Sequence, residues 1–486
     1  MRRTWISTSV IFMIAMAITL MGFSHELMAA AKKPWETIQW DKPRPADERL
    51  SAPEYILPEG WQEATKGVKR ILHFNAGAME HDPGTLANFK VFEKLTGIKV
   101  DYVEVSDQVL LQKTISALVS RDAKITSMCV SEPAYSMQHL ISANWIERMD
   151  VIWGPRVQKI YPPGLVQIMK GPDGHIYGTV DTQKANMMYL RPSWLKAAGV
   201  GIPTTWGEMV DAAKKTREWA EKNLDQTYWG MAFTGDHYFL QHLQAGVYAQ
   251  GGRIMVNGKV NILTPEFKRT WETYVNFIAK DKSAPEAILG WTWNDYQQAF
   301  AMGKAAMIDM GLNTNRVIYA NPEKAPGVHK DVYGKPDKGP KGLGDWIALA
   351  PPKWSKEMPD KYIGAAPTNF SSFVINRFAP DREKAAAMLL GEVRMSRQGG
   401  LNELLVEGNS PFLSAVFDDP QVMAKVPYSD VEKICNQNAV LEVFPPGAEK
   451  MMDILMEYFG KAATGKMPAL QALEKAQEEI TKLTTY

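Results

Sequence analysis

The most informative stretch of the chain is Ala-Met-Gly-Lys-Ala-Ala-Met-Ile-Asp-Met-Gly-Leu-Asn, residues 301–313. The small residues Ala301 and Gly303 predict the end of a helix that packs closely against a neighbouring element. The mostly apolar run 306–310 predicts a short buried strand, and Gly311 opens a loop after it. A helix that leads directly into a buried strand is typical of folds in which helices cover a sheet.

Strands and helices alternate in the same way along most of the chain. Apolar and alternating runs predict strands at 68–74, 98–105, 125–130, 176–181, 228–234, 346–351 and 372–376. Amphipathic runs predict helices at 83–95, 107–120, 134–143, 206–221, 237–249, 265–280, 294–302, 381–395, 449–463 and 468–483. This order predicts an α/β fold with mostly parallel sheets flanked by helices.

The length of the chain suits two lobes rather than one. It has 486 residues, of which 45% are hydrophobic and 22% charged, so it can build two cores. We expect the chain to cross between the lobes near residues 177–191, 346–352 and 405–412, which would form a hinge. The predicted division is lobe 1 at 67–181 plus 350–405 and lobe 2 at 182–349 plus 412–486.

The N-terminal segment differs from the rest of the chain. Arg2 and Arg3 precede an apolar run over 6–23, and small residues follow at 29–31, so residues 1–31 are interpreted as a cleaved secretory signal peptide. The alternative is an uncleaved membrane anchor, although serine and threonine within the run weaken it as a membrane span. The mature protein is therefore expected in the periplasm. Residues 32–66 are rich in proline and predict an extended arm along the surface.

Charge and cysteine content limit the possible partners. Without residues 1–31, the 55 basic and 54 acidic side chains become 53 of each, which argues against nucleic acid or an anionic membrane as a partner. The only cysteines are Cys129 and Cys435. In an oxidising compartment they could form a disulfide, or they could be two separate buried thiols.

Several motifs occur in an order that resembles a known family. They are Phe92-Glu-Lys-Leu-Thr-Gly-Ile-Lys-Val, Met188-Tyr-Leu-Arg, Trp194-Leu-Lys-Ala-Ala-Gly, Pro203-Thr-Thr-Trp-Gly-Glu, Tyr248-Ala-Gln-Gly-Gly-Arg, Phe300-Ala-Met-Gly-Lys-Ala-Ala-Met and the segment 469–480. Together they resemble the extracellular solute-binding proteins of bacterial ABC importers, carbohydrate-binding family 1, over about residues 68–486. The resemblance implies a monomeric two-lobed protein that delivers a sugar, oligosaccharide or polyol to an inner-membrane permease. It implies neither a cofactor nor catalysis.

The chain departs from the family pattern at two positions. Family members often carry a tryptophan just after the strand that ends here near Met310, where this chain has Leu312 and Asn313. Some members also carry a ligand-facing tryptophan near the start of the helix at 449–463, where this chain has Met451 and Met452. The sugar-binding mode of the best-known members therefore need not apply here.

Candidate ligand-binding residues follow from the chemistry of a sugar. Carboxylates and amides bind its hydroxyl groups, and aromatic rings cover its apolar faces. Such side chains are expected on loops at the carboxyl ends of strands, between the lobes. The candidates are Asn75, Glu80, Glu132, Tyr135, Asp181, Gln183, Asp236, Tyr238, Trp291, Trp293, Asn313 and Asn369.

Several candidates also have simpler structural interpretations. Glu80 can be a solvated loop residue, Asp236 a helix cap and Asn313 a turn residue. Trp291 and Trp293 can be core aromatics. Glu132 is harder to explain in this way, because glutamate is a poor cap for the helix that follows it.

Other functions remain open at this stage. A glycoside hydrolase would need two carboxyl groups facing each other across a cleft, and no Gly-x-Ser-x-Gly or His-Glu-x-x-His motif is present. The same fold could bind a metal, a polyamine or glycerol 3-phosphate. A phosphate would require Lys184 or Arg191 in the cleft, and Arg191 is expected to face solvent.

Overall fold

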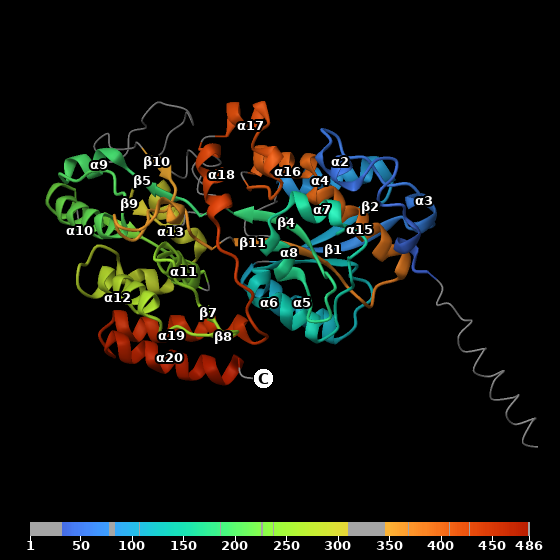
Figure 1. Ribbon diagram of the computed structural model, residues 1–486. Helices are drawn as coiled ribbons and strands as arrows, with labels where there is room; N and C mark the ends of the chain where they lie inside the picture. The colour runs from blue at the N-terminus through green and yellow to red at the C-terminus, as the bar shows by residue number, and fades with distance from the viewer. Residues whose placement is uncertain are drawn as a thin grey trace, which may run out of the picture.

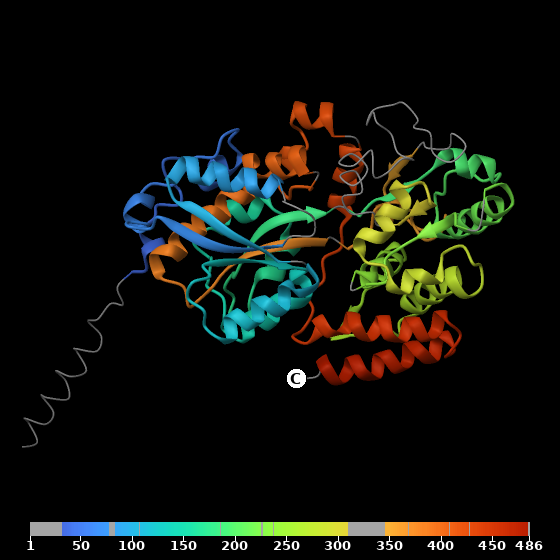
Figure 2. The ribbon, with the colours of Figure 1, turned by 180° about the vertical axis from the view of Figure 1, so that it is seen from behind.

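The computed structural model describes residues 32–76, 83–105, 107–184, 186–224, 227–236, 238–309, 346–367, 369–407, 409–426 and 428–484. This part of the chain forms two lobes, each built around its own sheet, as the sequence predicts (Figures 1 and 2). The proposed signal peptide, Glu80 and Asn313 lie outside the described residues.

Lobe 1 contains a five-stranded sheet in the order β2-β1-β3-β11-β4. The strands are β1 (Arg70–Ala76), β2 (Lys99–Val105), β3 (Ser127–Ser131), β4 (Thr179–Lys184) and β11 (Asn369–Ile375). The main helices around them are α4 (Pro83–Thr96), α5 (Asp107–Val119), α6 (Pro133–Ser142), α7 (Pro155–Ile160), α8 (Pro163–Met169), α15 (Asp381–Met395) and α16 (Arg397–Asn402).

The sheet is mostly parallel, as predicted, with one reversed strand. Strand β1 pairs in parallel with β2 and β3, whereas β11 is antiparallel to both β3 and β4. The reversed strand is the one that enters from lobe 2. Local alternation of strands and helices predicts parallel pairing, but the direction of a strand that returns from another lobe depends on the tertiary path.

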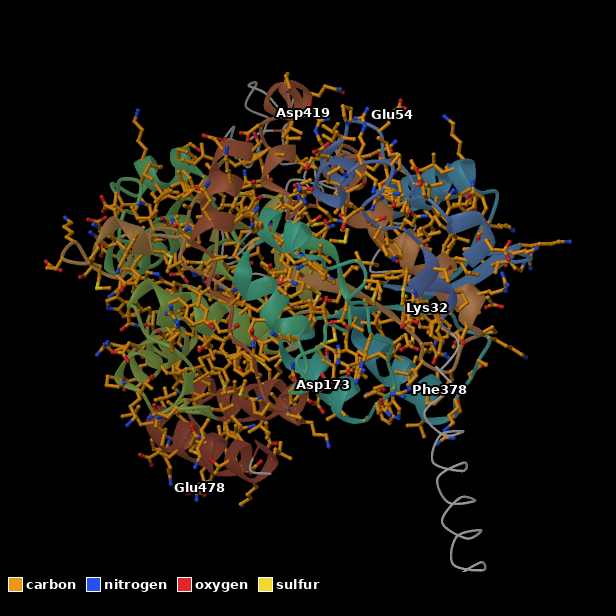
Figure 3. The ribbon with its side chains drawn as sticks, turned by 45° about the vertical axis from the view of Figure 1, so that its right-hand side comes forward. Lys32, Glu54, Asp173, Phe378, Asp419 and Glu478 are labelled. Carbon is orange, nitrogen blue, oxygen red and sulfur yellow. The ribbon has the colours of Figure 1, made fainter. Side chains whose placement is uncertain are left out.

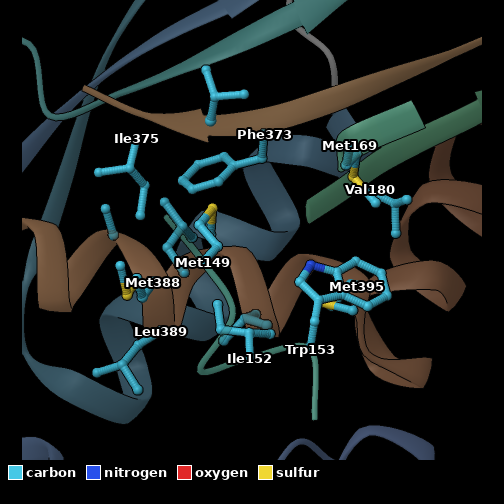
Figure 4. Packing of buried hydrophobic residues seen from close by; sticks show 14 of the residues in the cluster. Met149, Ile152, Trp153, Met169, Val180, Phe373, Ile375, Met388, Leu389 and Met395 are labelled. Atoms are coloured by element: carbon cyan, nitrogen blue, oxygen red, sulfur yellow. The ribbon is translucent and has the colours of Figure 1, made fainter. Parts of the chain in front are cut away.

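Helix α15 lies against the lobe 1 sheet and forms much of its core (Figure 4). Asp381 and Glu383 occupy its first turn and Arg394 its last, an order that complements the helix dipole. Met388 and Leu389 of this helix and Phe373 of β11 are fully buried. Trp153 closes the same core and donates its indole N–H to the Gly178 carbonyl over 2.7 Å.

The N-terminal arm is not extended, which corrects the sequence prediction. It folds into the short helices η1 (Pro34–Thr37), α2 (Ala46–Ser51) and α3 (Trp61–Ala64). Trp35, Leu50 and Tyr55 are buried in the core of lobe 1. The prolines obscured a helical pattern, and the apolar residues between them pack against the lobe.

Lobe 2 contains a four-stranded sheet in the order β10-β5-β9-β6. The strands are β5 (Met188–Leu190), β6 (Trp229–Ala232), β9 (Ala305–Ile308) and β10 (Ile347–Leu349). The helices are α9 (Pro192–Ala197), α10 (Trp206–Asn223), α11 (Phe239–Ala249), α12 (Pro265–Ala279), α13 (Trp293–Ala301), α19 (Met451–Ala463) and α20 (Ala469–Thr484). Strand β5, which arrives from lobe 1, is antiparallel to β9 and β10, whereas β6 and β9 are parallel.

The stretch at 301–313 folds as predicted where the structure describes it. Helix α13 ends at Ala301, Gly303 turns the chain with a φ of 69°, and all four residues of β9 are buried. The predicted start of α10 is also confirmed, because the Thr205 side chain accepts a hydrogen bond from the Glu208 N–H over 3.2 Å.

The remaining elements are short and lie in the connections between the main strands and helices. They are β7 (Met255–Val256), β8 (Lys259–Val260), η2 (Glu286–Gly290), η4 (Asp360–Tyr362), η5 (Glu403–Glu407, a π-helical turn), η6 (Ser414–Val416), α17 (Pro420–Lys425), α18 (Ser429–Asn438) and η7 (Ala448–Lys450). In Figure 3, Lys32 and Phe378 mark lobe 1 and Glu478 marks α20 of lobe 2.

The third crossing between the lobes lies later than the predicted 405–412. Phe412 and Leu413 still pack in the core of lobe 1, whereas Tyr428 packs against Trp346 of lobe 2, with 5.4 Å between ring centroids. Residues 439–447 then descend between the lobes from α18 to α19 (Figures 1 and 2). Cys129 and Cys435 are both buried, and they form no disulfide with each other.

Candidate functional site

Helices α6 of lobe 1 and α11 of lobe 2 face each other across the seam between the lobes. Each helix follows a strand of its own sheet, β3 or β6, so the seam lies at carboxyl ends of strands. Glu132 directly precedes α6 in a left-handed conformation, with a φ of 51°, and makes no capping hydrogen bond with its side chain. Such a backbone is uncommon for glutamate, and uncommon conformations concentrate at functional sites.

Two pairs of side chains join the helices. Gln241 donates its amide N–H to the Glu132 carboxylate, and the Tyr135 hydroxyl donates to the Gln244 side-chain oxygen over 2.7 Å. All four side chains are buried. Because residues three apart lie on one helical face, the two pairs form adjacent rungs between α6 and α11.

The hydrogen bond between Tyr135 and Gln244 continues into lobe 2 as a series of hydrogen bonds. Gln244 donates to the Tyr248 hydroxyl over 2.9 Å, and Tyr248 donates to the Glu442 carboxylate. Glu442 also accepts the backbone N–H of Met255 over 2.9 Å. This series of hydrogen bonds fixes the segment 439–447 to lobe 2 and sets the orientation of the Gln244 amide.

The phenol groups of Tyr135 and Tyr248 in this series of hydrogen bonds remain protonated over a wide pH range. Burial raises the pKa of Tyr135 well above its usual value, and the nearby Glu132 and Glu442 carboxylates add to the effect. Burial and the Glu442 charge likewise raise the pKa of Tyr248. Both hydroxyl groups therefore act as hydrogen-bond donors to the groups named above.

A third contact joins the lobes beside this seam. His139 of α6 lies 3.2 Å from the Glu449 carboxylate of η7. The hydrogen bond to Glu449 raises the pKa of His139, although burial opposes it. Burial alone would raise the pKa of Glu449, but the hydrogen bond and charge of His139, together with backbone N–H groups, outweigh it, so the pKa of Glu449 is lowered.

The seam encloses a small cavity of about 20 Å³, which is room for about one water molecule. Its wall combines carboxylate and amide groups with aromatic and aliphatic side chains, and among the side chains that the structure describes there, none is a lysine or an arginine. The lining residues on which the site depends are Glu132, Tyr135, Gln241, Gln244, Phe370 and Glu442. Carboxylates and amides suit hydroxyl groups, and the rings of Tyr135 and Phe370 suit apolar faces.

A second group of predicted residues lies in lobe 2, away from the cavity lining. Asp236 accepts the backbone N–H of Tyr238 over 2.9 Å and that of Trp293 over 2.7 Å, so it joins the starts of α11 and α13. Tyr238 and Trp293 are buried, with 6.5 Å between ring centroids. The Trp291 carbonyl accepts the Gly235 N–H. Asp236 thus binds backbone N–H groups at the starts of both helices, although the N-cap residues are Tyr238 for α11 and Thr292 for α13.

The remaining predicted residues are spread along the sheet of lobe 1. Asn75 is buried near the end of β1, and it hydrogen-bonds to His73. Asp181 and Gln183 lie on β4, and Gln183 pairs with Phe370 of the cavity wall. Asn369 begins β11. Of the predicted residues whose side chains the structure describes, Glu132 and Tyr135 lie at the cavity.

The sequence analysis missed Gln241, Gln244 and Glu442. The two glutamines and Tyr248 recur at intervals of three and four residues on α11, a helix whose residues are all buried. Polar side chains at helical spacing within an apolar helix are a signal that could have identified the two glutamines. Glu442 lies in a segment without periodicity, so it offered no comparable signal.

Arg191 is buried, which corrects the expectation that it faces solvent. Its guanidinium lies over the Phe300 ring at 4.6 Å and donates to the Phe300 carbonyl. Arginine can be buried in this way because its planar group stacks on an aromatic ring while it donates hydrogen bonds. Arg191 is therefore part of the lobe 2 core and not of the cavity wall.

The described residues contain neither a metal site nor a membrane span. No group of three or more histidine, cysteine, aspartate or glutamate side chains among them is arranged to hold a metal ion. Within the same residues, no helix has the length and apolar character needed to cross a membrane.

The family model of bacterial extracellular solute-binding proteins matches residues 87–427. The chain belongs to this family, whose members bind solutes and are not enzymes.

Solved structures of solute-binding proteins have the same fold. T. maritima MalE3 with bound maltose is 20% identical, with a TM-score of 0.70 over 85% of this chain and 99% of that chain. An ABC transporter solute-binding protein from Agrobacterium radiobacter in complex with ribitol is 20% identical, with a TM-score of 0.67 over 86% and 99%. One from Thermotoga lettingae bound with α-D-tagatose is 18% identical, with a TM-score of 0.70 over 86% and 100%.

Proposed function

We propose that this protein is the periplasmic substrate-binding component of an ABC importer, which captures a sugar, oligosaccharide or polyol between its lobes. The observation that carries the proposal is the seam between α6 and α11. There, side chains of both lobes hydrogen-bond to each other around a cavity lined by carboxylate, amide and aromatic groups. Structures of the same fold hold maltose, ribitol and tagatose, which supports this class of ligand.

Ligand capture follows from the geometry of the seam. A solute that touches Glu132 of lobe 1 and Gln241 of lobe 2 binds the closed form better than the open form. The ligand shifts the population toward closure by its difference in affinity for the two forms. The permease would then recognise the closed form.

The proposal includes the maturation and organisation of the chain. Residues 1–31 would be removed on export, and the mature protein would act as a monomer in the periplasm without a cofactor. The predicted division into lobes is 67–181 plus 350–405 and 182–349 plus 412–486. The two main apolar cores support it, except that Phe412, Leu413, Val416, Phe417 and Val422 pack in the core of lobe 1. Asn75, Glu80, Asp181, Gln183, Asp236, Tyr238, Trp291, Trp293, Asn313 and Asn369 remain candidate ligand residues.

The other ligand classes have less support. Glycerol 3-phosphate would require a cationic partner, and the described side chains that line the cavity include no lysine or arginine. A polyamine would find the carboxylates of Glu132 and Glu442 there, but it would not use the two glutamine amides as fully as a polyol would.

A thermal-shift screen of the mature protein tests the proposal. Maltose, ribitol, D-tagatose and D-mannitol would be compared with glycerol 3-phosphate and spermidine. A ligand at a hundredfold excess over its dissociation constant stabilises the fold by about 2.7 kcal/mol. X-ray scattering with the stabilising compound should show a more compact molecule. Stabilisation by none of the four sugars and polyols, or no compaction at saturation, would count against the proposal.

A further inference from the structure

Gln241 has an unusual position on α11. It lines the seam cavity, only 3% of it is exposed, and it donates its amide N–H to Glu132 of the opposite lobe. Among the described residues, its side-chain oxygen has no hydrogen-bond partner. A buried acceptor without a partner costs free energy, so such an atom in the wall of a binding cavity indicates a partner in the functional complex.

The orientation of this amide is fixed by its neighbour. The Gln241 nitrogen, which can only donate, faces a carboxylate oxygen of Glu132, which accepts. The amide oxygen is then left as an acceptor beside the carboxylate. Gln241 therefore presents a neutral acceptor beside the Glu132 carboxylate, and a guest that binds this oxygen must supply a donor.

We propose that Gln241 is a specificity-determining residue of this site. Its oxygen accepts a hydroxyl hydrogen of the guest, while its nitrogen holds Glu132 and so couples the guest to closure of the lobes. This inference rests on the proposed function, and it deepens that function by selecting uncharged, hydroxyl-bearing guests. An ionised phosphate offers only acceptors and a negative charge to the same wall, so the site rejects it.

A charge exchange across the seam tests the closing role of Gln241 without any ligand. Gln241→Glu places a second carboxylate against Glu132, whereas Glu132→Gln combined with Gln241→Glu restores one acid and one amide. Gln112→Glu adds the same charge at an exposed position on α5 and serves as the control. X-ray scattering would be recorded up to strongly alkaline pH, because two adjacent buried carboxyl groups share a proton until the pH is well above their ordinary pKa. Cooperative thermal melting would show that each variant is folded.

We expect Gln241→Glu to increase the radius of gyration, and the double variant and the control to remain close to the wild type. A folded Gln241→Glu variant as compact as the wild type would overturn the proposal. So would a double variant as expanded as Gln241→Glu, because the pair would then not control closure.

Ligand binding tests the specificity directly. For any of maltose, ribitol, D-tagatose or D-mannitol that binds the wild type, Gln241→Leu should weaken binding at least tenfold, and Gln112→Leu should not. Unchanged binding by Gln241→Leu, or tight binding of glycerol 3-phosphate by the wild type, would overturn the proposal. If none of the four compounds binds the wild type, the proposed function fails, while the ligand-free scattering comparison still decides the role of Gln241.

Discussion

At the scale of single residues, the least expected feature is the buried acid Glu432 on α18. Burial raises the pKa of this carboxyl to about 8 from its ordinary value of 4.5, although a hydrogen bond with Ser410 acts in the opposite direction. One of its oxygens has no hydrogen-bond partner among the described residues. The folded protein therefore holds a proton there that the unfolded chain releases.

The sign of this shift predicts how Glu432 affects stability with pH. Between about pH 4.5 and 8 the folded state binds more protons than the unfolded state, so the contribution of Glu432 falls as pH rises. Glu432→Gln should be more stable than the wild type near pH 8, by a few kcal/mol at most, and similar to it near pH 4. Urea unfolding at several pH values measures this. A stability difference that does not change with pH would contradict the assignment.

Arg49 and Glu392 show how the N-terminal arm is held. They form an ion pair of 2.7 Å with both side chains fully buried, and Tyr55 also donates to Glu392. Glu392→Gln should lower the free energy of unfolding by about 3–5 kcal/mol, because it leaves a buried guanidinium without a counter-charge. Arg49→Met combined with Glu392→Leu should cost less than Glu392→Gln alone.

An exposed ion pair provides the control for this prediction. Lys33 and Asp381 lie 2.8 Å apart with side chains 50% and 38% exposed. Lys33→Ala should therefore change the free energy of unfolding by about 1 kcal/mol or less. Denaturant unfolding compares all three variants. A similar cost for Glu392→Gln and Lys33→Ala would show that the buried pair does not anchor the arm.

At the scale of elements, the contact between β6 and α10 depends on a single glycine. A Cβ atom at Gly230 would lie 1.8 Å from the Ala213 carbonyl oxygen of α10, which no rotamer change can relieve. Strand β6 forms the edge of the lobe 2 sheet and leads toward α11, so a shift there would also displace the helix that carries Gln241. Close packing of this strand and helix thus positions the seam.

Gly230→Ala should lower the free energy of unfolding by about 1–3 kcal/mol, because it forces the strand and the helix apart. Gly207 lies in the first turn of α10, and a Cβ there would meet nothing within 4 Å. Gly207→Ala should raise the stability by up to about 1 kcal/mol, because alanine favours the helix more than glycine does. Thermal unfolding of both variants measures the contrast, and an equal effect would contradict it.

At the scale of the whole molecule, the lobes are joined by a contact that can be titrated. His139 of lobe 1 meets Glu449 of lobe 2, with Trp145 beside the imidazole ring and Lys450 near enough to oppose its charging. Because the pKa of His139 is raised in the folded protein, its charge stabilises the fold. This stabilisation is complete below pH 6.5, the ordinary pKa of histidine, and is lost as the pH rises through the raised pKa. Because the pKa of Glu449 is lowered, its negative charge also stabilises the fold, and this stabilisation is lost only as the pH falls below 4.5.

The His139–Glu449 pair should therefore stabilise the contact between the lobes most between pH 4.5 and the raised pKa of His139. We expect the stability advantage of the wild type over His139→Gln to shrink as pH rises above neutrality, because the imidazole then loses its charge. Melting temperatures across this range measure the effect, and scattering shows whether the lobes separate. Identical pH dependence in the two proteins would exclude a role for this contact.

Most of the secondary structure can be predicted from local sequence patterns. Helix α15 matches its predicted range, and the start of α10 follows from Thr205 and Glu208. These features depend on local periodicity and capping, which a linear pattern records. The two-lobed fold and the family also follow from motifs that are local in sequence.

Only the tertiary structure decided which side chains meet between the lobes. Glu132 and Gln241 are 109 residues apart, and their contact depends on how two sheets are placed relative to each other. The same dependence explains the antiparallel direction of β11, the buried position of Arg191 and the compact arm. A sequence pattern shows which face of an element is apolar, but packing between distant elements determines what that face contacts.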